Sequence, residues 1–153
     1  MASTRPHRTG LGLAHEAIAS LRHLTDAFRR RREQLALSVG LTDGQWGVLE
    51  EIATEHFMPS MFAKSRDSSA AAVSKTLRQL LDKGLVRASL SKSDGRQRSY
   101  ALTDKGQRTL QTLREERLQA IENIWLTLDG RQVQDFVTFA ALLTERLEQY
   151  KSD

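Results

Sequence analysis

The stretch AAAVSKTLRQLLDKGLVRASLSKSDGRQRSYALTDKG, residues 70–106, decides the fold. Its first part places apolar residues at helical spacing, and Gly84 supplies a helix stop. Residues 85–90 then alternate apolar and polar side chains, as a strand with one buried face does. Asp94-Gly95 is a strong hairpin signal that pairs this strand with residues 98–102. The stretch therefore predicts a helix followed by a β-hairpin and the start of another helix.

The predicted helix has two faces of different chemistry. One face is apolar and consists of Val73, Leu77, Leu80 and Leu81. The opposite face begins with small residues and continues with cations, namely Ala71, Ser74, Lys75 and Arg78. Small residues let the backbone approach a DNA major groove, and the cations reach guanine edges or phosphates. Ser68 or Ser69, just before the helix, is placed to meet a phosphate. The alternative is an ordinary amphipathic helix with a solvated basic face.

The adjoining hairpin is also basic. Residues 64–98 carry nine Lys and Arg against three Asp, a net charge of +6, whereas the whole chain carries +4. A localised basic segment is typical of proteins that bind nucleic acid. We therefore interpret the hairpin as a wing whose DNA contacts come from Arg87, Lys92, Arg96 and Arg98. Arg96 at the tip is predicted to enter the minor groove, with Asp94 fixing the direction of an arginine. Basic residues that serve only solubility are the alternative.

The remainder of the chain is predicted to be helical. One long helix spans Leu11 to Val39, and a second begins at Thr42, which has Gln45 at capping-box spacing. A short helix covers residues 60–65. Two long helices follow the hairpin, one from Thr103 or Asp104 through about Thr127 and one from Asp129 to about Tyr150. The run RRRRE at residues 29–33 is interpreted as a solvated face, with a phosphate contact as the alternative.

Several classes of function are disfavoured by what the sequence lacks. The chain of 153 residues has no cysteine, which excludes thiolate catalysis, disulfides and zinc-thiolate sites. His15 and His23 lie about 12 Å apart along a helix, too far to share one metal ion. No nucleophile-elbow or phosphate-loop motif is present, so we expect no enzyme, no metal and no cofactor. Without a long apolar run, the expected location is cytoplasmic.

Three segments together resemble the MarR family of winged helix-turn-helix transcriptional regulators. They are LTDGQWGVLEEIA at 41–53, FAKSRDSSAAAVSKTLRQLLDKGLV at 62–86 and SKSDGRQRSYALTDKG at 91–106. The matching positions are Leu80, Gly84, Leu85, Val86, Asp94, Arg96, Leu102, Thr103 and Gly106. The resemblance implies a mainly α fold with a small β-hairpin: a winged helix at 41–103, with dimerisation helices at 1–40 and 104–153. Arg66 and Ser68 depart from the family's pattern, because apolar residues are common there.

The apolar stripes of the long helices support a dimer. They consist of Leu13, Ala17 and Leu21, then Leu110, Leu113, Leu118, Ile121, Ile124 and Trp125, and finally Val133, Phe136, Val137, Ala140, Leu143 and Leu147. One small winged helix cannot cover this surface, so we expect an intertwined homodimer. Packing within one chain is the alternative.

The resemblance also implies a function. It implies a sequence-specific dimeric regulator of transcription, a repressor bound to pseudo-palindromic double-stranded DNA. Family members often bind small anionic aromatic compounds between the dimerisation region and the winged helix. His23, Trp46 and Phe62 are the candidate ligand-lining residues here, and core or surface roles are the alternative for each. An architectural DNA-binding protein without an effector is the alternative function.

Overall fold

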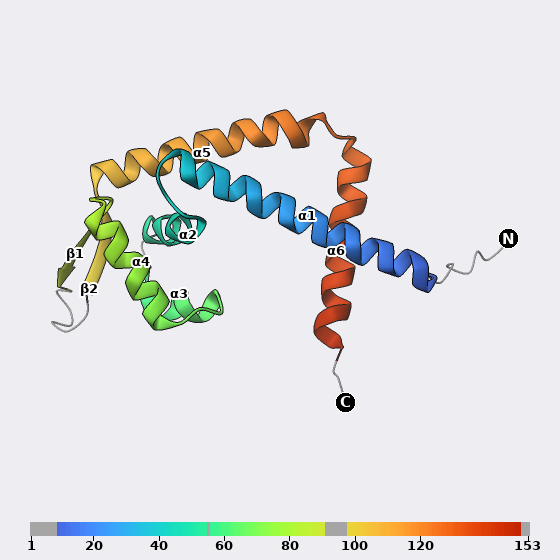
Figure 1. The fold of residues 1–153 in the computed structure, drawn as a ribbon, viewed down its shortest axis with the longest axis horizontal. Helices are drawn as coiled ribbons and strands as arrows, with labels where there is room; N and C mark the ends of the chain where they lie inside the picture. The colour runs from blue at the N-terminus through green and yellow to red at the C-terminus, as the bar shows by residue number, and fades with distance from the viewer. Residues whose placement is uncertain (1–8, 55, 91–97, 151–153) are drawn as a thin grey trace. The chain divides into compact units, whose positions relative to one another are not determined.

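A computed structural model describes residues 9–54, 56–90 and 98–150. The elements follow the order that the sequence predicts, a long helix, three shorter helices, a hairpin and two long helices (Figure 1). They are α1 Leu11–Ser38, α2 Asp43–Ile52, α3 Pro59–Ser65, α4 Ala70–Asp82, β1 Val86–Leu90, β2 Arg98–Leu102, α5 Asp104–Ile124, the 3-10 turn η1 Trp125–Thr127 and α6 Gly130–Gln149. The predicted fold class, mainly α with a two-stranded antiparallel hairpin, is confirmed.

The chain divides into two compact units, Met1–Leu113 and Arg114–Asp153. The first unit holds α1 to β2 and the first part of α5, and the second holds the rest of α5, η1 and α6. The assignment of residues 1–40 and 104–153 to dimerisation stays a prediction, because a single chain contains no second copy.

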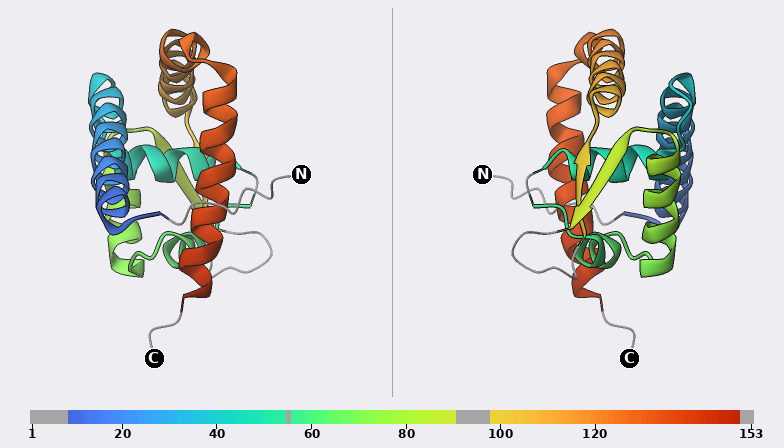
Figure 2. Two further views of the ribbon diagram at one scale, coloured as in Figure 1. Left: turned by 90° about the vertical axis from the view of Figure 1, so that its right-hand side faces the viewer. Right: turned by 90° about the vertical axis from the view of Figure 1, so that its left-hand side faces the viewer.

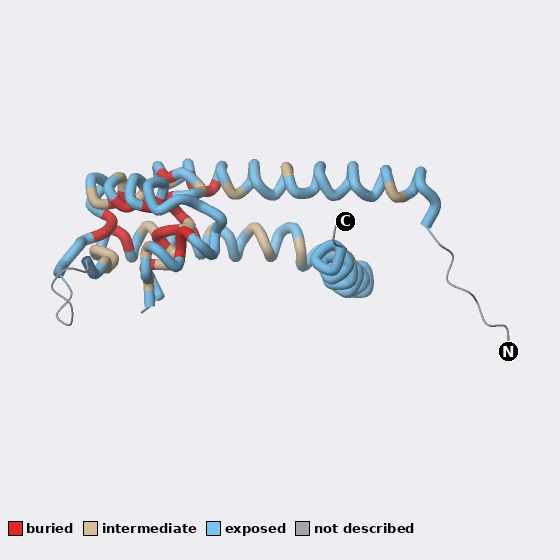
Figure 3. Tube along the Cα trace, turned by 90° about the horizontal axis from the view of Figure 1, so that it is seen from below, coloured by how far each residue is buried: buried red, intermediate tan, exposed pale blue. Residues whose placement is uncertain are grey.

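The first unit has one hydrophobic core, formed where α2, α4 and the end of α1 meet the hairpin base and α5. Buried residues gather there, as the red segments of the trace in Figure 3 show. The largest fully buried side chains are Trp46, Leu41, Leu49, Leu80, Leu110 and Leu113. Leu110 and Leu113, which we expected on the dimerisation stripe, are therefore part of the chain's own core. An apolar stripe on a helix indicates that the stripe is buried, but it does not indicate whether the same chain or a second copy covers it.

Three helices of this unit end in the same hydrogen-bonded motif. After α1, Gly40 has φ +74°, and after α4, Gly84 has φ +68°, a backbone region that favours glycine. In each case the residue that follows the glycine donates its N–H back to the last turn of the helix. The Leu41 N–H donates to the Ala36 carbonyl at 2.9 Å, and the Leu85 N–H donates to the Leu80 carbonyl at 3.0 Å.

After α3 the left-handed position is occupied by an aspartate. Asp67 has φ +50°, and the Ser68 N–H donates to the Ala63 carbonyl at 2.8 Å. Asp and Asn tolerate this conformation better than other non-glycine residues. The turn that departs from the family pattern therefore still closes as a standard helix end, with the Arg66 guanidinium 5.4 Å from the centre of the Phe62 ring.

The start of α2 shows the predicted capping box. The Gln45 N–H donates to the Thr42 Oγ1 at 3.1 Å, and the Thr42 N–H donates to the Gln45 Oε1 at 3.1 Å. The Gln45 side chain is buried, and its Nε2 also donates to the Gln79 Oε1 of α4 at 2.9 Å. A buried amide that satisfies both its ends in this way fixes α4 against α2 in a definite rotation.

The two strands of the hairpin are drawn as neighbouring arrows in Figure 2. Their register pairs Val86 with Leu102 and Leu90 with Arg98. Only Val86 of β1 is buried, so the expected alternation of buried and exposed residues is present at the base and lost further out. Residues 87–90 of β1 are all exposed, whereas Tyr100 of β2 is partly buried and packs against the core and the Phe57 ring. At the base, the Thr103 Oγ1 donates to the Gly84 carbonyl at 2.6 Å and accepts from the Gly106 N–H at 3.1 Å, so Thr103 begins α5 as predicted.

The second unit consists of helix and 3-10 turn. The long helix ends at Ile124 rather than Thr127, because residues 125–127 tighten into η1. Asp129 begins α6 as predicted, and its Oδ1 accepts from the N–H groups of Arg131 and Gln132. None of the residues of α6 is buried in the single chain. In the part of the chain that the structure describes, no helix is long and apolar enough to cross a membrane.

Candidate nucleic-acid interface

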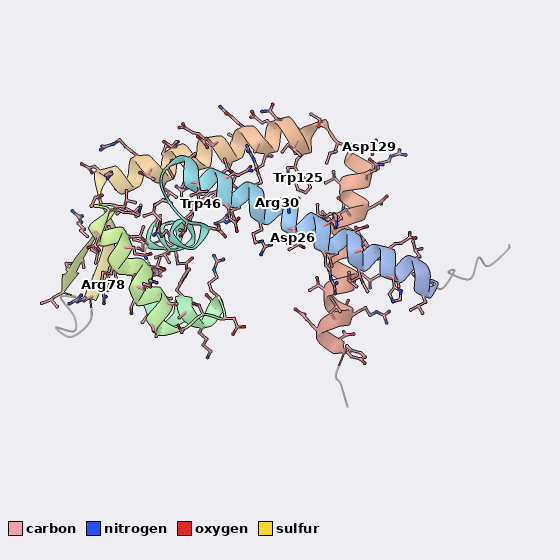
Figure 4. All side chains as sticks on the ribbon, viewed as in Figure 1. Asp26, Arg30, Trp46, Arg78, Trp125 and Asp129 are labelled. Carbon is pink, nitrogen blue, oxygen red and sulfur yellow. The ribbon has the colours of Figure 1, made fainter. Side chains whose placement is uncertain are left out.

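The exposed face of α4 is the face that the sequence predicts. Val73, Leu77 and Leu80 are buried against α2, α3 and the hairpin base. Because these positions follow helical spacing, the side chains between them point the other way. The residues on that outer face, all exposed, are Ala71, Ser74, Lys75 and Arg78. Figure 4 shows Arg78 on the outside of α4, on the side of the hairpin. The helix thus presents small residues at its start and cations toward its middle.

The start of α4 adds donors for an anion. The Ser69 Oγ accepts from the Ala72 N–H at 3.0 Å and caps the helix, which leaves the hydroxyl hydrogen free to be donated outward. Ser68 is exposed beside it. A helix N-terminus carries a partial positive charge from its unpaired N–H groups. Asp67 is the one acid at this end, and it stands two residues before the cap.

The hairpin separates two of its predicted DNA contacts. Side chains directly opposite each other in an antiparallel pair share a face, and neighbours along a strand alternate. Arg98 pairs with Leu90 and so lies on the same face as Val86, whereas Arg87 lies on the other face. Both arginines are exposed. The predicted contacts Lys92, Asp94 and Arg96 lie outside the described residues.

The basic side chains of this surface are not neutralised within the described chain. Lys75, Arg78, Arg87 and Arg98 form no ion pair with any described residue. The two recorded ion pairs both involve α1, Arg29 with Asp26 at 2.8 Å and Arg32 with Asp43. The cations of α4 and the hairpin are therefore available to phosphates.

A cavity of about 140 Å³ lies between α2, the end of α3 and the start of α4. Gly44 and Gly47 of α2 leave space in it, because they carry no side chain. Phe62 and Val73 line its apolar part, and Arg66 stands among its polar lining residues. The volume is close to that of an engineered apolar cavity that admits benzene, about 150 Å³.

The three candidate ligand-lining residues lie in different environments. Phe62 lines the cavity just described. Trp46 is 1% exposed and belongs to the core. His23 is exposed on α1. The structure does not bring the three together in one described cavity, and their ligand role stays a prediction. Among the described residues, no three His, Cys, Asp or Glu side chains gather to hold a metal ion.

Sequence reasoning missed two features near this surface. One is Asp67 in the left-handed conformation, for which the signal is an Asp that stands two residues after the end of a short helix and directly before Ser-Ser. The other is Arg32, which we assigned to a solvated run, but whose guanidinium lies on Trp46. Its signal is spacing, because Arg32 stands three and four residues before the buried Leu35 and Ala36.

Comparisons with known proteins relate this geometry to a family model and to several solved structures. Residues 39–97 match the MarR family. MarR from Staphylococcus aureus, solved in complex with salicylate and kanamycin, is 19% identical and has a TM-score of 0.76, over 92% of this chain and 96% of that one. AbsC of Streptomyces coelicolor, a MarR family transcriptional regulator, is 17% identical with a TM-score of 0.74, over 94% of this chain and 100% of its own.

A third solved structure contains DNA. The complex of S. aureus MepR with DNA is 18% identical and has a TM-score of 0.68, over 86% of this chain and 96% of that one. A comparison with curated proteins found no match. The family match in residues 39–97 covers the helix-turn-helix and the first strand of the hairpin, and the shared fold extends over most of the chain. Residues 39–97 therefore match the MarR family, and the chain has the winged-helix fold seen in the solved MarR-family structures that it resembles.

Proposed function

We propose that this protein is a cytoplasmic, dimeric, sequence-specific DNA-binding regulator of transcription, and that it acts as a repressor. The observation that carries the proposal is the outer face of α4, where exposed Ser74, Lys75 and Arg78 follow a capped helix start. An α-helix of this kind fits the major groove, where an Arg pairs with the O6 and N7 of a guanine. Contacts to phosphate come from the exposed cations that form no ion pair with a described residue, which are Lys75, Arg78, Arg87 and Arg98.

The hairpin serves as the wing. Arg98 and Arg87 lie on opposite faces of the hairpin. Each of them therefore contacts the DNA backbone on its own side of the wing. Arg96, at the predicted tip, enters the minor groove, whose narrow A·T-rich stretches concentrate negative potential. Asp94 holds an arginine in the required direction. These contacts give the wing an electrostatic role and leave base selection mainly to α4.

A second copy of the chain covers the exposed apolar side chains of the helices outside the winged-helix core. Leu21 and Phe28 of α1 and Phe136, Phe139 and Leu142 of α6 are each between 45% and 57% exposed. Large apolar side chains exposed along each of these helices mark an interface. Two winged helices about 34 Å apart on one face of the duplex then read the two halves of a pseudo-palindromic operator.

A small ligand releases the repressor. The support is the complex of the S. aureus MarR relative with salicylate, together with the cavity beside α4. A planar aromatic acid places its ring against Phe62 and its carboxylate near Arg66, and binding there favours one position of α4 over another. A ligand that binds the DNA-free conformation better lowers DNA affinity by the same factor.

The test is a binding titration at one fixed salt concentration. The protein is titrated against a palindromic site selected from the DNA upstream of its own gene, and against a scrambled duplex of the same composition. A specific regulator binds the site at least about 10³-fold more tightly. Nearly equal affinities that both fall steeply with salt would instead support the alternative, an architectural DNA-binding protein without an effector.

A further inference from the structure

We infer that Arg32, Asp43 and Trp46 form a clasp that fixes the angle between α1 and the winged helix, and thereby sets the half-site spacing that the dimer accepts. This inference rests on the proposed function for its consequence at DNA, but the clasp itself is a property of one chain.

The four consecutive arginines of α1 do not behave alike. Arg29 forms an ion pair with Asp26 of the same helix, and both side chains are mostly exposed. Arg32 instead lies on the helix face of Leu35 and Ala36, which are the buried residues of α1. It is half-buried, and it therefore points toward α2 rather than into solvent.

The guanidinium of Arg32 is held in two directions at once. Its Nε donates to the Asp43 Oδ1 at the first residue of α2. Its Cζ lies 4.1 Å from the centre of the Trp46 ring, so that the cation covers the face of the indole. The indole is itself fixed, because it is 1% exposed and its Nε1 donates to the Glu50 Oε1 at 3.3 Å.

A planar group with a carboxylate at its edge and a ring beneath its face has little freedom to rotate. Lysine cannot replace Arg32 in this role, because its ammonium is a compact point charge without a planar group that could stack on the indole while pairing with the carboxylate. Figure 4 shows Trp46 between α1 and α2, where the clasp closes. The clasp thus joins the helix that we assign to dimerisation with the helix that supports α4.

Because the clasp lies near the C-terminal end of α1, a small change in angle there moves the N-terminal end of the helix by a large distance. None of residues 11–34 of α1 is buried, and Figure 3 shows that part of the helix as exposed or intermediate. From Arg32 to Leu11 the helix is about 30 Å long. A tilt of about 10° at the clasp moves the far end by about 5 Å, given that length. One base-pair step is about 3.4 Å, so a loose clasp changes the spacing by a whole step.

The first experiment needs no DNA. Because the chain has no cysteine, Ser20→Cys on α1 and Asp82→Cys at the end of α4 give two defined spin-label sites. Labelled chains are diluted with unlabelled chains so that pulsed dipolar spectra report distances within one chain. In the Arg32→Ala background the distance distribution is expected to widen about two-fold. In Arg31→Ala, which removes an exposed neighbouring arginine, it is expected to stay unchanged. Equal widths in all three backgrounds would overturn the clasp.

The second experiment measures affinity for operators whose half-sites are moved apart in steps of one base pair. The unmodified protein is expected to prefer one spacing over its neighbours by about 10-fold, and Arg32→Ala to reduce this preference to about 2-fold with the same dependence on salt. Arg32→Lys keeps the charge and is expected to behave like Arg32→Ala.

Asp43→Asn separates the clasp from a phosphate contact. If Arg32 bound phosphate, loss of the neighbouring acid would strengthen DNA binding and Arg32→Ala would flatten the salt dependence. The clasp predicts that Asp43→Asn also broadens the accepted spacing. If the unmodified protein shows no operator preference, the proposed function fails and the label distances alone decide on the clasp. If it binds specifically and Arg32→Ala keeps both the distances and the spacing, the clasp fails while the function stands.

Discussion

Replacement of Gly106 by alanine tests how closely α5 is held against the turn after α4. A Cβ on residue 106 would lie 2.0 Å from the Leu85 carbonyl oxygen and 3.0 Å from its carbon, and both are backbone atoms. Carbon and oxygen in contact normally stay about 3.3 Å or more apart. The start of α5 must therefore retreat by about 1 Å, since 3.3 Å is the shortest comfortable approach. The same carbonyl accepts the Thr103 N–H at 3.0 Å, and this hydrogen bond is lost or stretched.

The opposing effects can be weighed. Overpacking against backbone costs about 1–3 kcal/mol, and the lost hydrogen bond adds about 1 kcal/mol. Alanine in a helix regains about 1 kcal/mol relative to glycine. The expected net loss in the free energy of unfolding is about 2 kcal/mol, which lowers the melting temperature of a chain of this size by about 4–8 °C.

The assay is urea unfolding at fixed protein concentration, followed by tryptophan fluorescence, since Trp46 is buried in this core. Gly47→Ala is the matched control, because Gly47 lies inside α2 and nothing is within 4 Å of its Cβ position. That variant is expected to gain about 0.5–1 kcal/mol. If Gly106→Ala were as stable as the unmodified protein, or if both variants moved in the same direction, the close approach of α5 to Leu85 would be refuted.

Three further predictions concern DNA, charge and assembly. Arg78→Ala is expected to weaken binding to the preferred site by about 1–3 kcal/mol and to relax sequence choice, as seen in a selection from random duplexes; an equal loss for every sequence would make Arg78 a phosphate contact instead. Asp67→Asn is expected to raise DNA affinity a few-fold at low salt with an unchanged melting temperature, because asparagine keeps the left-handed turn and removes a negative charge. Leu113→Ala is expected to lower the free energy of unfolding by about 2–5 kcal/mol, whereas Leu142→Ala is expected mainly to weaken the dimer in sedimentation experiments. The reverse result would place Leu113 at the interface between copies.

Local signals in the sequence predicted most of the winged helix. The capping box of Thr42 and Gln45, the stop at Gly84 and the buried face of α4 depend only on residues near one another in the chain, and each is confirmed. Thr103 at the start of α5 belongs to the same class. Such features follow from hydrogen-bonding needs that the neighbours themselves satisfy.

Features that depend on distant partners could not be predicted. The apolar stripe through Leu110 and Leu113 was visible, but the sequence does not tell whether the same chain or another covers it. Arg32 looked like its neighbours until α2 was placed beside it. Which face of the hairpin each arginine occupies depends on the strand register, because a shift by one residue would have put Arg87 and Arg98 on the same face.

The buried amide pair between Gln45 and Gln79 decides which side chains of α4 a partner encounters. Consecutive residues on a helix point about 100° apart, so a slip by one position would turn Ser74 and Arg78 away and bring forward the residues beside them. Leucine at 45 would fill the same space but would accept several rotations of α4 equally well. Under the proposed function, the choice of bases is thus set on the inner side of α4, by the Gln45–Gln79 hydrogen bond, which faces away from the proposed DNA-binding surface.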